Sequence, residues 1–176
     1  NVTLILGICL FISCKKDNQK TTNVNASFDK YKTEFIDNMS KLYPEWAAYQ
    51  GNHSFDSLLV VPNKENRMQQ LQFAKSNLDS LKKFAVSDLN DSNKIDSYLI
   101  KNKLESINFG INEFKEFEWN PSNYNTSGSF AEILNGNYAP LEERLKSIRN
   151  KLNTIEAYYA AAKENIKNPT TEHLQL

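Results

Sequence analysis

Few residues of this sequence have side chains suited to metal or acid–base chemistry, and they are widely spaced. The two histidines, His53 and His173, lie about 120 residues apart. Neither belongs to an H-E-x-x-H helix, the pattern that places two imidazoles on one face around zinc. Carboxylate pairs such as Glu116 and Glu118 lie on polar helix faces, where solvated charge is the ordinary role. The sequence also has no serine elbow and no glycine-rich phosphate loop, so it predicts no catalytic residue and no metal ligand.

The N-terminal stretch "LILGICLFISCKK" is the most distinctive local pattern. Its apolar block, residues 2–12, is about half of the ~20 residues that a membrane span needs, so we expect the h-region of a secretory signal instead. In "FISC" a small residue precedes Cys14, which resembles the lipobox of bacterial lipoproteins. That resemblance implies a signal peptide over residues 1–13 and lipid attachment at Cys14. An ordinary signal with an incidental cysteine is the alternative.

Lipidation at Cys14 would make the membrane a partner of the protein, because several acyl chains together give stable anchoring. The protein is then expected to be exported and anchored in the bacterial cell envelope, facing the periplasm or the cell surface. The following run, "KKDNQKTTNVNAS", has almost no apolar content, so residues 14–27 are predicted to form a flexible lipidated tether. Neither a charged n-region nor an initiator methionine precedes Asn1, so we expect the sequence to start inside its signal.

The overall composition points to a helical domain without nucleic-acid partners. The chain has 21 basic and 21 acidic residues, and no segment carries a basic stripe. It has only five glycines and five prolines, and its mean hydropathy of -0.60 is typical of helices with polar outer faces. We expect one domain, over residues 28–176.

Apolar residues recur every three or four positions in four long segments, which predicts four long helices. The first starts near Ser27, restarts at Pro44 and closes at Gly51. The second and third cover about 63–85 and 92–114, and a short helix follows over 129–136. The fourth covers 140–166 with a regular apolar stripe: Leu141, Leu145, Ile148, Leu152, Ile155, Tyr159, Ala162 and Ile166. No segment predicts a strand pair, so the expected fold is all-α, a bundle of long antiparallel helices that covers this stripe within the chain.

Aromatic residues gather in the two irregular junctions, "YPEWAAYQGNHSFD" and "FEWNPSNYN". Large rings at helix junctions more often cap the end of a core than bind a ligand. The alternative is a carbohydrate or peptide platform or a channel wall, for which the candidate residues are Trp46, Tyr49, Phe55, Trp119 and Tyr124.

Several motifs in order resemble one known family: "YPEWAAYQGNHSFDS", "LDSLKKF", "WNPSNY", "RLKSIRNKLNTIEAYYAAAKENIKNP" and "TTEHL". Together they resemble the N-terminal half of the family called domain of unknown function 885, over residues 28–176. The resemblance implies a secreted or lipid-anchored helical protein similar to gluzincin-type zinc metallopeptidases, with the zinc motif in the C-terminal half. It therefore implies no cofactor in the present residues, zinc and a peptide substrate for the full-length protein, and a role for these helices as scaffold and as one wall of a substrate channel.

Two alternatives remain open at this stage. One is a helical surface lipoprotein that binds glycan or peptide without chemistry, and the other is a purely structural envelope protein. At the C-terminal end, "NPTTEHLQL" reads as a helix that has only begun, so we expect the helical domain to be cut at residue 176 and to be the N-terminal half of a larger one.

Overall fold

The computed structural model describes the backbone of residues 15–174 and the side chains of residues 23–173. Within this range the fold is all-α without strands, as predicted. The α-helices are α1 (Lys15–Leu42), α2 (Pro44–Tyr49), α3 (Lys64–Leu81), α4 (Asp91–Phe109), α5 (Ser127–Asn135), α6 (Leu141–Leu152) and α7 (Ile155–Asn165). No described helix is both long enough and apolar enough to span a bilayer.

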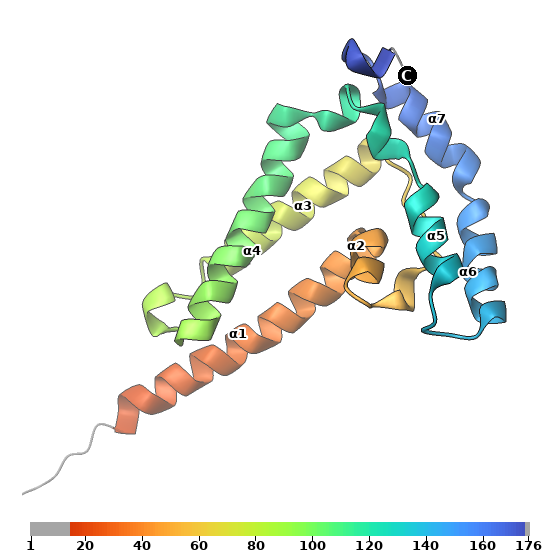
Figure 1. The fold of residues 1–176 in the computed structure, drawn as a ribbon. Helices are drawn as coiled ribbons and strands as arrows, with labels where there is room; N and C mark the ends of the chain where they lie inside the picture. Colours follow the sequence, from red (N-terminus) through yellow and green to blue (C-terminus); the bar gives the residue numbers. More distant parts are fainter. Residues whose placement is uncertain (1–14, 175–176) are drawn as a thin grey trace, which may run out of the picture.

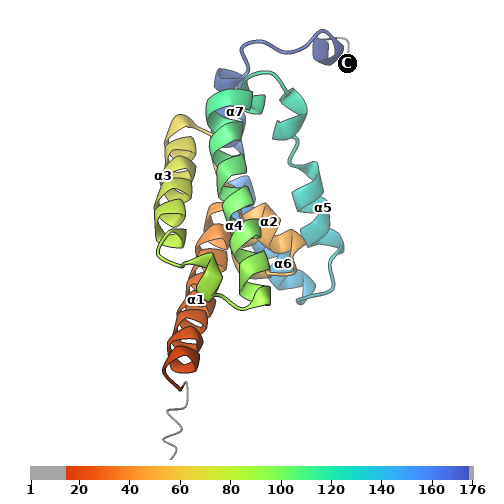
Figure 2. The same ribbon diagram turned by 90° about the vertical axis from the view of Figure 1, so that its left-hand side faces the viewer.

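The helices pack in two groups. Figure 1 shows α3 and α4 as a hairpin with the long α1 beside it, and α5, α6 and α7 together on the other side of the molecule. The view in Figure 2 places α4 between α3 and α5, and the short α2 lies close to the C-terminal group. Residues 44–62 lie between α1 and α3 in the sequence, but in space they contact the C-terminal group, for example where Asp56 meets Tyr138.

Several helix starts follow from local capping. The side chain of Asn63 accepts a hydrogen bond from the Asn66 amide at 2.9 Å, and that of Asn90 accepts from the Asn93 amide at 2.8 Å. Each bond satisfies one of the free amides at a helix start. Pro44 opens α2 as a first-turn proline. The predicted start of α3 at Asn63 and the restart at Pro44 are confirmed.

The first core lies between α1, α3 and α4. Its buried members include Phe28, Phe35, Leu104 and Ile107, and the ring of Phe84 packs edge-on against Phe28 at 5.1 Å between centroids. These residues recur at helical spacing, so their burial is the packing that the apolar periodicity predicts.

Helix α1 begins N-terminal to the predicted helix start at Ser27. It runs from Lys15, and Val24 packs against the first core. The side-chain oxygen of Asn25 accepts hydrogen bonds from the Asn90 amide and the Asn93 side chain, both at 2.9 Å. The prediction of a tether that extends to residue 27 therefore differs from the structure, in which α1 begins at Lys15 and Asn25 has partners at the start of α4. Cys14 and the signal segment lie outside the described residues.

The long helix predicted over 140–166 is broken into α6 and α7. At the break the amides of Asn153 and Thr154 bond to carbonyls three residues back, at 3.2 and 3.0 Å. Asparagine and threonine favour such turns because their side chains compete with the helical backbone. The expectation of one continuous helix was wrong at this point.

The apolar stripe of α6 and α7 also faces differently from the prediction. Leu141, Leu145, Leu152 and Tyr159 are 52, 46, 51 and 41% exposed, and we call these four residues the outward stripe. On α6 the buried residues are instead Arg144 and Lys151. The expectation that the other helices cover this stripe was therefore wrong for these four residues. Ile95 and Leu99 of α4 are likewise mostly exposed, at 60 and 63%.

Candidate functional site

A group of polar and aromatic side chains lines a cavity between α3, α4, α7 and the irregular segment that follows α4. We call this space, of about 540 Å³, the central cavity. Its walls include the rings of Tyr43, Phe117, Tyr124 and Tyr158. Its polar lining includes Asn66, Arg67, Gln70, Lys103, Glu116 and Asn123. The volume is in the range of small-molecule sites in proteins.

The segment after α4 brings two of these rings into the cavity. Helix α4 unwinds through a π-turn over Gly110–Phe114, and Lys115 adopts a left-handed conformation with φ 48°. The chain reverses there, and the 3₁₀ turn Pro121–Tyr124 follows. The Tyr124 hydroxyl donates to the Phe117 carbonyl at 2.7 Å, which fixes this tyrosine and the Phe117 backbone to each other.

Among the charged side chains that line the central cavity, Arg67 has its position fixed by several contacts. Its Nη1 donates to the Pro62 carbonyl and to Oδ1 of Asn165, both at 2.9 Å. The Phe117 ring lies under the guanidinium, with its centroid 4.2 Å from Cζ. Two hydrogen bonds and one stacking contact thus hold the plane of the guanidinium in a single orientation.

Tyr43 contributes a polar atom that has no partner. Its hydroxyl is buried and makes no hydrogen bond among the described residues. Burial raises the pKa of Tyr43 to about 12, so the hydroxyl remains protonated and able to donate at neutral pH. A second cavity of about 310 Å³ shares Tyr43 with the central cavity and extends toward Trp46.

A second polar cluster is centred on Asp56, which is 3% exposed. His53 Nδ1 lies 3.1 Å from Asp56 Oδ2, and the Tyr138 hydroxyl donates to the same oxygen. Partial burial and the Asp56 carboxylate raise the pKa of Tyr138. These three residues, here called the Asp56 cluster, line a cavity of about 410 Å³ together with Arg144.

The chain that precedes the Asp56 cluster is shaped by local backbone bonds. Gly51 has φ +83°, and its amide and that of Asn52 bond to the Ala48 and Ala47 carbonyls, both at 2.8 Å. This is a Schellman ending of α2, in which glycine takes the left-handed position. Asn52 then caps the 3₁₀ turn that carries His53.

The described side chains do not fit a zinc site. Within residues 23–173, no three histidine, cysteine, aspartate or glutamate side chains converge as zinc ligands. His53 is oriented by Asp56, and His173 Nδ1 lies 2.9 Å from the Thr170 hydroxyl. No reaction step through a metal is therefore assigned to these residues.

The five junction aromatics do not form one site. Trp46 lines the cavity next to the central one, and Tyr124 lies in the wall of the central cavity itself. Tyr49 is 79% exposed, and Phe55 is half-buried in the turn after α2. Trp119 lies at the far end of α4, where its indole nitrogen donates to the Phe114 carbonyl at 3.1 Å. Among the described cavities, none is lined by two of the five.

Sequence reasoning missed Arg67, Tyr43 and Tyr158 as cavity residues. Arg67 lies in the polar run "KENRMQQ", where one arginine cannot be distinguished from its solvated neighbours. His53 and Asp56 lie in the same junction motif, and their spacing of three residues is the signal that could have indicated the Asp56 cluster.

Comparison with known proteins gives a family and a related fold. The family model described as "Bacterial protein of unknown function (DUF885)" matches residues 44–175. A solved structure from Shewanella oneidensis, described as "a putative lipoprotein of unknown function", is similar with a TM-score of 0.81 and 42% sequence identity. The match covers 84% of this chain and 27% of that chain, so the chain spans about a quarter of that protein's length. No protein of curated function matches the chain.

Proposed function

Because this chain belongs to the DUF885 family of bacterial proteins, we propose that it forms the N-terminal helical scaffold of a lipid-anchored cell-envelope protein. The observation that carries the scaffold role is the outward stripe. Four large apolar side chains on α6 and α7 are 41–52% exposed, although their spacing is that of a buried helix face. The Shewanella protein is far longer than the match, so a larger relative has chain available to cover this stripe.

The lipid anchor rests on Cys14 and on the description of the Shewanella protein as a putative lipoprotein. The full-length protein with a complete signal should incorporate radioactive palmitate and sediment with membranes. Cys14→Ser should abolish both, because it removes the thiol that is acylated. Membrane attachment of the Cys14→Ser variant at the wild-type level would refute the anchor.

The finer proposal is that the full-length protein is a zinc metallopeptidase-like hydrolase. It rests on the resemblance of the ordered motifs to a family whose zinc motif lies in the C-terminal half. The present residues would then contribute one wall of the substrate channel, for which the central cavity is the candidate. The full-length protein should contain one zinc ion, measured by mass spectrometry, and should cleave peptides from a mixed pool in a chelator-sensitive manner. A metal-free, inactive full-length protein would refute the hydrolase while leaving the scaffold role intact.

A non-enzymatic binding lipoprotein is the second candidate function. The specific observation in its favour is the lining of the central cavity, which contains both aromatic rings and amide side chains such as Asn66 and Gln70. Rings and amides together suit glycans and peptides. Saturable binding of a glycan or peptide pool without turnover would favour this candidate over the hydrolase.

A further inference from the structure

We propose that the central cavity binds a carboxylate, the free C-terminal carboxylate of a peptide, through Arg67 with assistance from Lys103. This deepens the proposed function by naming what the cavity recognises, and it does not depend on hydrolysis.

The first argument is the unused half of the Arg67 guanidinium. Both of its hydrogen bonds leave from Nη1, whereas Nε and Nη2 have no hydrogen-bond partner among the described residues. These two nitrogens form the side-on fork that matches the two oxygens of a carboxylate. Arg67 also forms no ion pair with any described carboxylate, although it is only partly exposed.

The second argument is that Arg67 is already held in place before a ligand arrives. Asn165 accepts from Arg67 and also donates to the Pro62 carbonyl at 2.5 Å, so these three groups form one connected set. The Phe117 ring stacks on one face of the guanidinium. A ligand that uses this fork would lose little free energy to ordering the arginine.

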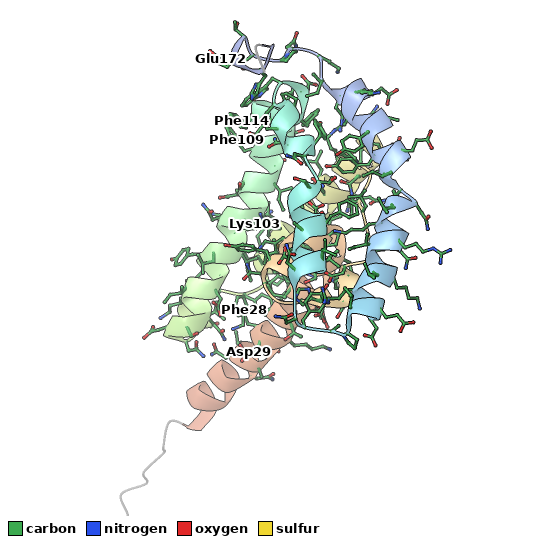
Figure 3. All side chains as sticks on the ribbon, turned by 45° about the vertical axis from the view of Figure 1, so that its right-hand side comes forward. Phe28, Asp29, Lys103, Phe109, Phe114 and Glu172 are labelled. Carbon is green, nitrogen blue, oxygen red and sulfur yellow. The ribbon has the colours of Figure 1, made fainter. Side chains whose placement is uncertain are left out.

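The third argument is the charge of the cavity lining. Lys103, which Figure 3 shows midway along α4, lines the same cavity and has no ion pair among the described residues. Its ammonium lies 5.7 Å from the centroid of the Tyr43 ring. The one carboxylate in this lining is that of Glu116, which accepts from Asn120 at 2.8 Å and pairs with neither cation. The lining itself therefore has two cations against one carboxylate. In addition to burial, the carboxylates of Glu45 and Glu118 raise the pKa values of Tyr158 and Tyr124 respectively, but neither forms an ion pair with Arg67 or Lys103 among the described residues.

The fourth argument concerns what else the ligand must offer. The buried Tyr43 hydroxyl is a donor without a partner, which suits an additional acceptor oxygen. The rings of Phe117, Tyr124 and Tyr158 provide an apolar wall for a side chain. A carboxylate next to an apolar side chain and a peptide carbonyl is the chemistry of a peptide C-terminus.

The experiment compares two fluorescein-labelled random pentapeptide pools, one with free and one with amidated C-termini, on the chelator-treated full-length protein. Fluorescence polarisation should show at least tenfold tighter binding of the free pool, because amidation removes the charge that the fork recognises. Chelation keeps any turnover out of the measurement, so loss of hydrolysis and loss of carboxylate binding are separate outcomes.

Variants then assign the effect to residues. Arg67→Met should weaken binding of the free pool at least tenfold while leaving the amidated pool unchanged, and Arg67→Lys should recover only part of the loss. Arg149→Met, a change at an exposed arginine of α6, is the matched control and should bind like the wild type. Lys103→Met, at an exposed position, should weaken the free pool severalfold and serves if Arg67→Met fails to fold.

Several results would overturn the inference. Equal binding of the two pools, or no binding of either at millimolar concentration, would do so. So would wild-type affinity in a folded Arg67→Met variant, or in Lys103→Met if that is the variant that folds. Amidated peptides bearing internal aspartate or glutamate that bind as tightly as the free pool would show that a side-chain carboxylate, and not the peptide terminus, is recognised.

Discussion

The imidazole of His53 lies flat on the phenol ring of Tyr138, with ring centroids 3.3 Å apart and planes 1° from parallel. Both side chains also contact the same carboxylate oxygen of Asp56, which lies 82 residues before Tyr138 in the sequence. The Asp56 cluster therefore ties the turn after α2 to the loop between α5 and α6. A buried carboxylate that depends on so few donors is sensitive to the loss of any one of them.

Replacing Tyr138 tests this connection. Tyr138→Phe keeps the ring stacked on His53 but removes the hydroxyl that donates to buried Asp56. The free energy of unfolding, from urea denaturation, should fall by about 1.5–3 kcal/mol, as expected for a hydrogen bond to a charged group. Tyr49→Phe, at a position that is 79% exposed, should change it by less than about 0.5 kcal/mol. Equal effects of the two changes would contradict a stabilising role for the cluster.

Arg144 should be important for the end of α5. This buried side chain donates through Nη1 to the carbonyls of Ile133 and Leu134 at 2.8 and 2.5 Å, and through Nε to that of Ala139 at 3.0 Å. Cationic donors at a helix C-terminus satisfy its free carbonyls and complement its dipole. Arg144→Met should lower the free energy of unfolding by about 2–4 kcal/mol, because buried carbonyls lose their donors.

Hydrogen exchange provides a local readout of the same change. Amides of α5 should exchange faster in Arg144→Met, whereas those of α3 should not change beyond the global loss of stability. The exposed Arg149→Met variant should leave both helices as in the wild type. Unchanged α5 exchange in Arg144→Met would rule out the capping role.

Burial of Lys151 should make the free energy of unfolding depend on pH. The side chain is 2% exposed, and desolvation lowers its pKa despite the nearby carboxylates of Glu45, Asp56 and Glu132. A pKa below the unfolded value means that the folded state binds the proton less tightly, so the charge destabilises the fold at neutral pH. Above the unfolded pKa of about 10.5 the Lys151 side chain is neutral in both states and does not destabilise the fold. As the pH falls from there through the folded pKa, the free energy of unfolding decreases, because the unfolded state binds the proton more tightly.

Lys151→Met removes the charge and keeps most of the apolar stem. The melting temperature of the variant should exceed that of the wild type at pH 7, and the difference should shrink as the pH approaches about 10.5. Lys146→Met, on the exposed face of the same helix, should show no such trend. A lower melting temperature of Lys151→Met at pH 7 would mean that the ammonium makes a net favourable contact, such as that with the Phe130 ring 5.7 Å away.

The outward stripe can be tested by comparing residues 23–176 alone with the proposed full-length protein. Leu152 is 51% exposed here, so Leu152→Asp should change the free energy of unfolding of residues 23–176 by less than about 1 kcal/mol. In the full-length protein the same change should cost about 3 kcal/mol or more, because it would place a charge in a covered apolar face. Asn150→Asp, two residues earlier at an exposed position, should have a small effect in both. Small effects of Leu152→Asp in both proteins would show that the stripe remains uncovered.

The sequence alone determined the features that depend on neighbours along the chain. Asn63 and Asn90 cap helices with bonds to amides three residues ahead, Pro44 starts a helix, and Gly51 ends one by taking a left-handed conformation. The apolar period of the first three long segments similarly predicted an all-α fold. These interactions span at most a few residues, so the residue types by themselves specify them.

Only the tertiary structure decided which faces are buried and which side chains meet. Leu152 and Lys151 are adjacent in sequence, yet the leucine is half-exposed and the lysine buried, because burial depends on where the neighbouring helices lie. Arg67 donates a hydrogen bond to Asn165, which lies 98 residues later in the sequence, and Tyr138 donates to Asp56, which lies 82 residues earlier. Contacts at such separations depend on the relative placement of whole helices, which the 3.6-residue period of each helix does not contain.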